Sequence, residues 1–287
     1  MSLSEAAMLV SLNINQWSAR KYDRQVSKEV CETKGADQNS GNFNKQLIPK
    51  LNLKNIQRVV NAARNYHYLN TLAWDHDGAD LLPAKHYIAY SSELSKFKNE
   101  FDHEVSKFIE EYPSILTNVM NNLAGLYNSN DYPSQERIKS KFNFEVNITP
   151  IPDVADFRID INKKDMDKLK QDLGNRLEAA NAAAEKDLFM RLYTTIAKAY
   201  MTLNTPDKIF RNSLILNIVE LVQKIPDMNF NDDEQLNQIA KDVSAEIRII
   251  DIEDLRKNKI YRRRVASNLE KDLKEIDQVY TDKWSGK

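Results

Sequence analysis

Residues 164–203 decide the fold of this chain, and they read KDMDKLKQDLGNRLEAANAAAEKDLFMRLYTTIAKAYMTL. An apolar side chain recurs every three or four residues, which is the spacing of one face of an α-helix. The stripe consists of Met166, Leu169, Leu173, Leu177, Ala180, Ala184, Leu188, Leu192, Ile196, Ala199 and Leu203. This spacing predicts one long helix, and the small residues around Ala180 would let a neighbouring helix approach closely. The spacing of this stripe corresponds more closely to an 11-residue repeat than to the 7-residue repeat of a leucine zipper. It therefore favours straight antiparallel packing of helices.

A short sheet is predicted before this helix. Phe142, Phe144, Val146 and Ile148 alternate with polar residues, and a second alternating run over residues 157–161 follows a proline-rich connection. Two runs of period two around such a connection predict an antiparallel hairpin. A looser alternation from Met8 to Ile14 predicts a third strand, and its addition to the hairpin would stabilise the sheet.

The remaining segments are mostly helical in pattern. We expect Tyr112-Pro113 to interrupt one of these helices, because proline lacks the amide hydrogen, and Thr205 to cap another. The predicted helices are residues 16–33, 53–72, 83–111, 114–127, 206–224 and 232–280, the last interrupted near Ile249.

These segments predict a predominantly helical α+β fold, with long antiparallel helices and a small antiparallel β-sheet. The helices of residues 83–127 and 164–203 are expected to pack against each other. Four regions follow from the pattern: 1–135, aromatic and basic helical with one strand; 136–162, a β-hairpin; 163–230, a long helical hairpin; and 231–287, a charged helical segment.

Composition restricts the class of protein. The 287 residues are enough for one large or two ordinary domains, and the 41% apolar content can fill a core. A net charge of −1 gives no global attraction to nucleic acid or to a membrane surface. Cys31 is the single cysteine, which excludes an intrachain disulfide and fits a reducing compartment. With no signal-peptide pattern and no long apolar run, we expect a cytoplasmic protein that does not enter a membrane.

Aromatic, basic and amide side chains crowd the segment from Trp17 to Pro83, which we predict to bind a protein partner. Loops that carry aromatic residues are frequent recognition surfaces, although such aromatics often belong to the core. We expect Phe43 to be a partner anchor and Trp74 to be a core residue. The predicted partner-binding residues are Trp17, Arg20, Lys21, Phe43, Arg64, Tyr66 and Trp74.

A basic run near the C-terminus provides the alternative, a nucleic-acid site. It holds Arg256, Lys257, Lys259, Arg262, Arg263 and Arg264 within nine residues, and such cations contact phosphates. Acidic residues precede and follow this run, so a solvated helix face or a docking surface is the competing interpretation.

Metal binding and catalysis have less support. His67, Asp75, His76, Asp77 and Asp80 are of ligand type, but their spacing matches no established metal site. A polar turn is the simpler interpretation. The sequence has no nucleophile elbow and no glycine-rich phosphate loop. We therefore expect a protein that is not an enzyme, with no catalytic residues and no cofactor.

An ordered series of short motifs resembles a known family. The motifs are Leu12-Asn13-Ile14, Trp17-Ser18-Ala19-Arg20-Lys21, Gly35-Ala36, Phe43-Asn44-Lys45, Ala62-Ala63-Arg64-Asn65-Tyr66-His67, Asp77-Gly78, Leu81-Leu82-Pro83 and Tyr132-Pro133-Ser134. Residues 8–225 resemble a family of unknown function encoded by tailed phages and prophages. Its members often lie near genes for MoxR-type AAA+ ATPases and von Willebrand A-domain proteins. The resemblance implies a phage origin, a place in the host cytoplasm and an ATPase partner, but no reaction.

Two functions are predicted from these observations. The first is a non-enzymatic, phage-encoded interaction protein, either an adaptor or an inhibitor or modulator of a host or phage protein complex. A homo-oligomer would suit the long apolar stripe. The alternative is a nucleic-acid-binding protein that works in phage genome processing.

Overall fold

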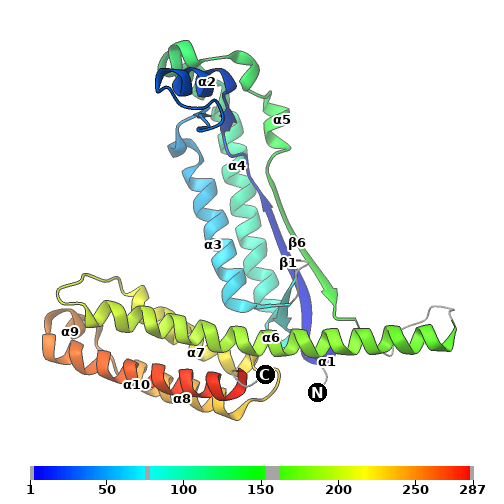
Figure 1. The fold of residues 1–287 in the computed structure, drawn as a ribbon, viewed down its shortest axis with the longest axis vertical. Helices are drawn as coiled ribbons and strands as arrows, with labels where there is room; N and C mark the ends of the chain where they lie inside the picture. The colour runs from blue at the N-terminus through cyan, green and yellow to red at the C-terminus, as the bar shows by residue number, and fades with distance from the viewer. Residues whose placement is uncertain (1–2, 75–77, 153–161, 285–287) are drawn as a thin grey trace. The chain divides into compact units, whose positions relative to one another are not determined.

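The structure is a computed structural model that describes residues 3–74, 78–152 and 162–284. The chain forms two compact units. Unit 1 comprises Met1–Ser11, Tyr68–Ile88 and Asn147–Lys287, and unit 2 comprises Leu12–His67 and Ala89–Val146. Helices dominate and the strands form small sheets, which confirms the predicted helical α+β class (Figure 1).

A small sheet is built from β1 (Ala7–Asn15), β4 (Leu72–Ala73), β5 (Asp80–Pro83) and β6 (Asn143–Pro150), in the order β4-β5-β1-β6. β5 runs antiparallel to β1, with Ala7 opposite Pro83, and β4 runs antiparallel to β5. The strands predicted from Met8 and from Phe142 are confirmed, as is their presence in one sheet. The strand predicted over residues 157–161 lies outside the described residues.

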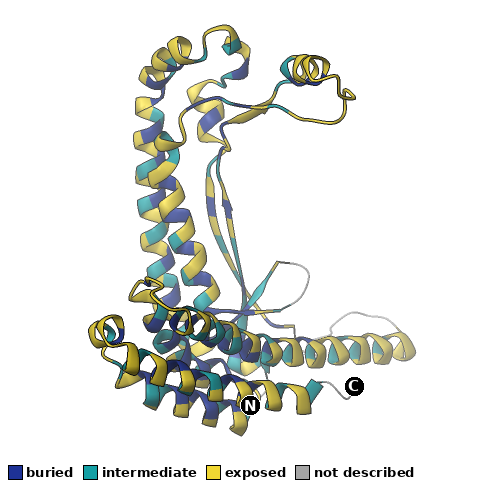
Figure 2. Ribbon diagram, turned by 60° about the vertical axis from the view of Figure 1, so that its left-hand side comes forward, coloured by how far each residue is buried: buried dark blue, intermediate teal, exposed yellow. Residues whose placement is uncertain are grey.

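Unit 1 contains a layer of helices whose bounds are α6 (Lys163–Asn204), α7 (Ser213–Met228), α8 (Glu234–Arg248), α9 (Ile252–Lys257) and α10 (Lys259–Trp284), together with the short α1 (Leu3–Ala6) and the 3-10 turn η2 (Ala84–His86). α6 packs against α10 and α7, and α7 packs against α8. The predicted stripe of α6 is buried from Ala180 to Leu203, where these neighbours cover it. None of residues 163–179 is buried, and Figure 2 shows this part of α6 in the colours of exposed and intermediate residues.

The start of α7 corrects the sequence prediction. Thr205 does not cap a helix at Pro206, because it ends α6 and its hydroxyl donates to the Met201 carbonyl. Residues 205–212 form a loop, and α7 begins at Ser213 and continues through Pro226. The interruption predicted near Ile249 is confirmed by the break between α8 and α9.

Unit 2 is built around α3 (Lys54–Asn70) and α4 (Tyr87–Leu123), with α2 (Arg24–Thr33), α5 (Gln135–Lys139), β2 (Arg20–Tyr22), β3 (Asn44–Gln46) and the 3-10 turns η1 (Lys50–Leu53), η3 (Ala124–Leu126) and η4 (Ser129–Asp131). α3 meets α4 through the stacked rings of Tyr66 and Tyr90, 6.0 Å apart, and through an ion pair of Arg58 with Glu100. Each long helix has neighbours within its own unit, α3 for α4, and α7 and α10 for α6.

Two local predictions in unit 2 are wrong. The helix expected from Gln16 begins only at Arg24, because residues 20–22 pair with β3 and the Asp23 side chain caps α2 through the Val26 amide. The break expected at Pro113 is absent, since α4 continues through it. Tyr112, just before this proline, is buried against Trp17 and Phe108. That burial offsets the roughly 3 kcal/mol that an internal proline costs a helix.

A partly buried carboxyl on α10 predicts an unusual pH dependence of stability. Burial, reinforced by the negative charges of Glu246, Glu275 and Asp242, raises the pKa of Asp272 to about 7. The Oδ2 atom of Asp272 is buried and accepts no hydrogen bond from any described residue. The folded state therefore holds a proton that the unfolded chain releases near pH 4. Stability should fall as pH rises from about 4 to about 7, because the folded state binds more protons in this window.

Replacing Asp272 by asparagine, which resembles the protonated acid, should remove this dependence. We expect Asp272→Asn to stabilise the protein by on the order of 2 kcal/mol at pH 8, a value reduced because the side chain is only partly buried, and by about a third of that at pH 5. Urea unfolding of both proteins at the two pH values measures the difference. An equal loss of stability between pH 5 and pH 8 in both proteins would show that another group titrates.

Candidate anion-binding pocket

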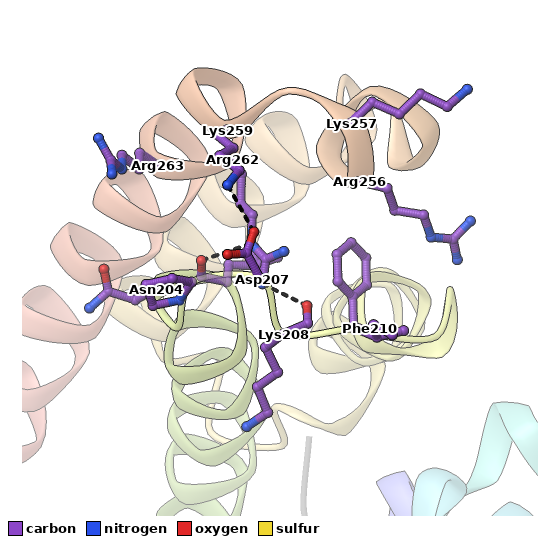
Figure 3. A pocket seen from close by; sticks show the side chains of 12 residues that line it. Asn204, Asp207, Lys208, Phe210, Arg256, Lys257, Lys259, Arg262 and Arg263 are labelled. Atoms are coloured by element: carbon purple, nitrogen blue, oxygen red, sulfur yellow. Dashed lines mark hydrogen bonds and ion pairs between the residues drawn. The ribbon is translucent and has the colours of Figure 1, made fainter.

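A basic pocket lies in unit 1, where the loop of residues 205–212 meets α9 and the start of α10 (Figure 3). Its volume is about 570 Å³. The lining is strongly cationic, with Asp207 as the one acidic residue among the described residues that form it. The basic side chains are Lys208, Arg256, Lys257, Lys259, Arg262 and Arg263.

Phe210 anchors the loop that forms one wall of this pocket. Its ring is 8% exposed and lies between two guanidinium groups, those of Arg256 and Arg262, each 5.5 Å from the ring centroid. Such cations are attracted to the negative face of an aromatic ring. The burial of Phe210 between residues of α9 and α10 explains why residues 205–212 form a loop rather than the first turns of a helix.

Arg262 has a structural role beneath the pocket. Its Nε donates to the Leu203 carbonyl at 2.9 Å, and its Nη2 donates to the carbonyls of Thr202 at 2.9 Å and Lys208 at 2.8 Å. Carbonyls at a helix C-terminus lack partners within the helix and carry partial negative charge. Arg262 therefore closes the end of α6 and fixes the loop through its Nε and Nη2 atoms.

Two more of the basic residues are neutralised by local acids. The Lys259 ammonium lies 2.9 Å from the Asp207 carboxylate, and the hydrogen bond from Lys259, together with its positive charge, lowers the pKa of Asp207. Arg256 pairs with Glu253 and also donates to the side chain of Asn212. These pairs reduce the positive charge that is left for a ligand, although the Lys259–Asp207 pair is itself largely exposed.

The other three basic residues, Lys208, Lys257 and Arg263, are here called the rim cations. All three are exposed, and none has a side-chain hydrogen bond or ion pair with another described residue. They come from the loop, from the end of α9 and from α10, and Figure 3 shows their side chains pointing in different directions around the pocket. Because they do not converge on one point, they suit an extended anion better than a single phosphate group.

The basic run predicted from the sequence is thus largely brought together. Five of its six members line the pocket, and only Lys257 and Arg263 are rim cations. The sixth, Arg264, lies over the ring of Tyr261, 5.1 Å from its centroid, and lines a separate hollow. Sequence reasoning missed Lys208 and Phe210, because residues 206–224 were assigned to a helix.

The residues predicted to bind a partner occupy varied positions. In unit 2, Trp17 is buried against Phe108 and Tyr112, and Tyr66 stacks on Tyr90. In unit 1, Trp74 is partly buried against the core, the position expected for it.

The remaining members of this set lie in unit 2. Arg20 is exposed in β2, and Lys21 donates to Asp131 at 2.6 Å. Arg64 donates to the Ile14 carbonyl at 3.0 Å. Phe43 is partly buried, and its backbone amide donates to the hydroxyl of Ser27. Their role in binding a partner stays a prediction.

The weak metal candidates are only partly described. Asp75, His76 and Asp77 lie outside the described residues. His67 is buried in unit 2, with its Nδ1 atom 2.6 Å from the Tyr90 hydroxyl. Within the described ranges, no three or more His, Cys, Asp or Glu side chains are grouped as a metal site would require.

Comparison with known proteins assigns a family. Residues 5–211 match the model of a protein family of unknown function, DUF3150, and the chain belongs to this family. The matched range ends within the loop that carries Lys208 and Phe210, so α9 and α10 lie beyond it. No curated protein and no solved structure matches the chain. Among the described helices, none combines the length and apolar character that crossing a bilayer requires.

Proposed function

We propose that this protein is a non-enzymatic nucleic-acid-binding protein whose basic pocket contacts the phosphate backbone. The observation that carries the proposal is the set of rim cations, Lys208, Lys257 and Arg263, which surround a concave surface and are exposed to solvent. Cations without protein partners can pair with phosphates without first breaking an ion pair. Each contact releases condensed counterions, which favours binding at low salt.

The distribution of charge supports a local site rather than general attraction. The whole chain carries a net charge of −1, so any affinity for a polyanion must come from a cluster such as this pocket. Figure 3 shows the rim cations pointing in different directions, so that an extended polyanion could meet them in turn where a single phosphate could not. Phe210 and Arg262 hold the backbone of the loop that carries Lys208 before a ligand binds, which lowers the entropic cost of association.

The biological setting of the proposal comes from the resemblance to proteins of tailed phages and prophages. In that setting the protein would act in phage genome processing in the host cytoplasm, and a MoxR-type AAA+ ATPase is the proposed protein partner. The family is one of unknown function, so membership in it favours none of the proposed functions.

The proposal is tested by fluorescence anisotropy with a labelled oligothymidine of about 20 nucleotides, a length that covers one or two ordinary single-strand sites. Binding should weaken steeply as salt rises. Polyglutamate of similar charge is the control for an acidic protein partner. Tighter binding to the oligonucleotide supports the proposal, whereas tighter binding to polyglutamate, or no binding to either polymer, contradicts it.

A second function, protein interaction, is favoured by one observation on α6. Residues 163–179 include no buried residue, although Met166, Leu169 and Leu173 continue the apolar stripe that is covered further along the helix. An amphipathic helix with an uncovered apolar face is a common protein-docking element. The protein would then be an adaptor, or an inhibitor or modulator, of a host or phage complex, or would form a homo-oligomer.

Co-purification and light scattering separate these outcomes. A stoichiometric partner that is lost when Leu169 and Leu173 are replaced by lysine would support protein interaction through α6. A homo-oligomer that dissociates in the same variant would assign this face to a second copy of the chain. An unchanged monomer that captures no partner would remove this second function.

A further inference from the structure

Ile209 is the most exposed large apolar side chain in the described part of the chain, at 95% exposure. It lies in the pocket loop between the rim cation Lys208 and the buried Phe210. Phe210 already anchors the loop, so Ile209 is not needed for packing. An isolated exposed apolar residue is common on protein surfaces, but this one lines a cationic pocket.

We propose that Ile209 contacts the face of an unpaired base, so that the pocket selects single-stranded over double-stranded nucleic acid. This inference rests on the nucleic-acid-binding function proposed above. Base faces are covered by their neighbours in a duplex and are accessible in a single strand, where apolar and aromatic side chains pack on them. A contact of this kind depends on apolar surface and adds no phosphate contact.

The pocket loop presents both a cation and an apolar group to a ligand. Lys208 and Ile209 are adjacent in this loop, both are exposed, and both line the pocket. The Lys208 carbonyl accepts from Arg262 at 2.8 Å, and Phe210 is held between Arg256 and Arg262. Both residues that flank Ile209 are therefore fixed to α10, and the exposed side chain is presented from an ordered position.

The test compares Ile209→Ala with a matched control, Ile249→Ala. Ile249 is 82% exposed and does not line this pocket. Anisotropy is measured with a labelled oligothymidine and with a duplex of the same length, each over a series of salt concentrations. A third variant, Ile209→Trp, offers a larger face for stacking.

Ile209→Ala should weaken single-strand binding about fivefold to tenfold, somewhat less than the loss of an aromatic contact to a base. The salt dependence should stay the same, because no phosphate contact is removed. Duplex binding should be unchanged, Ile249→Ala should match the unmodified protein, and Ile209→Trp should bind the single strand more tightly.

Three results would overturn the inference: equal weakening for single strand and duplex, a change in the salt slope, or no effect of either Ile209 variant. If the unmodified protein binds the oligonucleotide with a steep salt dependence while the Ile209 variants behave normally, only the base contact fails. If the unmodified protein binds neither nucleic acid, the proposed function itself fails.

Discussion

Replacing Lys208, Lys257 and Arg263 together by alanine is expected to weaken single-strand binding on the order of 100-fold at low salt. Three phosphate contacts of about 1 kcal/mol each give a loss of this size. The fold should be unaffected, because the rim cations make no side-chain hydrogen bond or ion pair within the described structure. Anisotropy with a labelled oligothymidine measures the affinity, and thermal unfolding confirms that stability is unchanged.

The matched control removes the same charge from exposed lysines elsewhere, in unit 2. Lys34, Lys54 and Lys107 are exposed, and their replacement by alanine changes the net charge by the same amount. This control should bind nearly as well as the unmodified protein. An equal loss of affinity in both triple variants would show that binding follows overall charge rather than the pocket.

Arg262 is unsuitable for this experiment even though it belongs to the same basic run. It donates to carbonyls at the end of α6 and in the pocket loop. Its removal would leave these carbonyls without their donor and would disturb the loop that carries Lys208. A loss of binding in an Arg262 variant would therefore not distinguish a phosphate contact from a structural role.

The largest expected effect on stability lies in unit 2, at a buried ionic cluster around Lys45. The Lys45 side chain is 5% exposed, and its ammonium lies 2.5 Å from the Asp131 carboxylate and 3.3 Å from that of Asp23. The same ammonium donates to the Leu126 carbonyl at 2.8 Å. The other oxygen of Asp131 accepts from Lys21 at 2.6 Å. The cluster thus joins β2 and β3 to η4.

Asp131→Ala should lower the free energy of unfolding by about 3 kcal/mol, because it leaves a buried ammonium short of its closest counter-charge. Lys21→Ala removes only the exposed partner and should cost no more than about 1 kcal/mol. Urea unfolding at pH 7 gives both values. If the two variants lose the same small amount, Lys45 must be solvated or paired in another way.

The same cluster should make stability sensitive to acid. Burial alone would raise the pKa of Asp131, but hydrogen bonds from Lys21 and Lys45 outweigh it and hold the pKa below its ordinary value. A carboxyl with a lowered folded-state pKa contributes stability above its unfolded pKa of about 3.9, and this contribution is lost as pH falls through the folded pKa. The acid-labile part of the stability should therefore be smaller in Asp131→Ala.

Periodicity predicted much of the fold, but it failed where distant residues decide local structure. The stripe of α6 is buried from Ala180 to Leu203, and the alternating apolar residues of β6 are buried at Phe144 and partly buried at Val146 and Ile148, so both patterns are visible in the sequence. The loop before α7 depends on Phe210 meeting Arg256 and Arg262 from α9 and α10. Pro113 stays within α4 because its neighbour Tyr112 is buried. Neither the packing of Phe210 nor the burial of Tyr112 is visible in a local sequence pattern.

The sequence predicted most of the basic residues of the candidate site, but not which of them are paired within the protein. A run of basic residues indicates local positive charge, but the pairing of each cation depends on the fold. Two arginines that are adjacent in the sequence differ completely in role. Arg262 is bonded beneath the pocket, whereas Arg263 is exposed at its rim and makes no side-chain hydrogen bond or ion pair with a described residue. The place of Lys208 at the rim depends on the conformation of the loop of residues 205–212, which a helical sequence pattern does not reveal.

The most direct test of the nucleic-acid-binding function is the salt dependence of oligothymidine affinity in the unmodified protein and in the variant that lacks the rim cations. For single strands, the logarithm of the binding constant falls with the logarithm of the salt concentration by about 0.7 for each phosphate contact. Loss of three contacts should therefore reduce the magnitude of the slope by about 2. Identical slopes in the two proteins would contradict the assignment of the basic pocket as the nucleic-acid site.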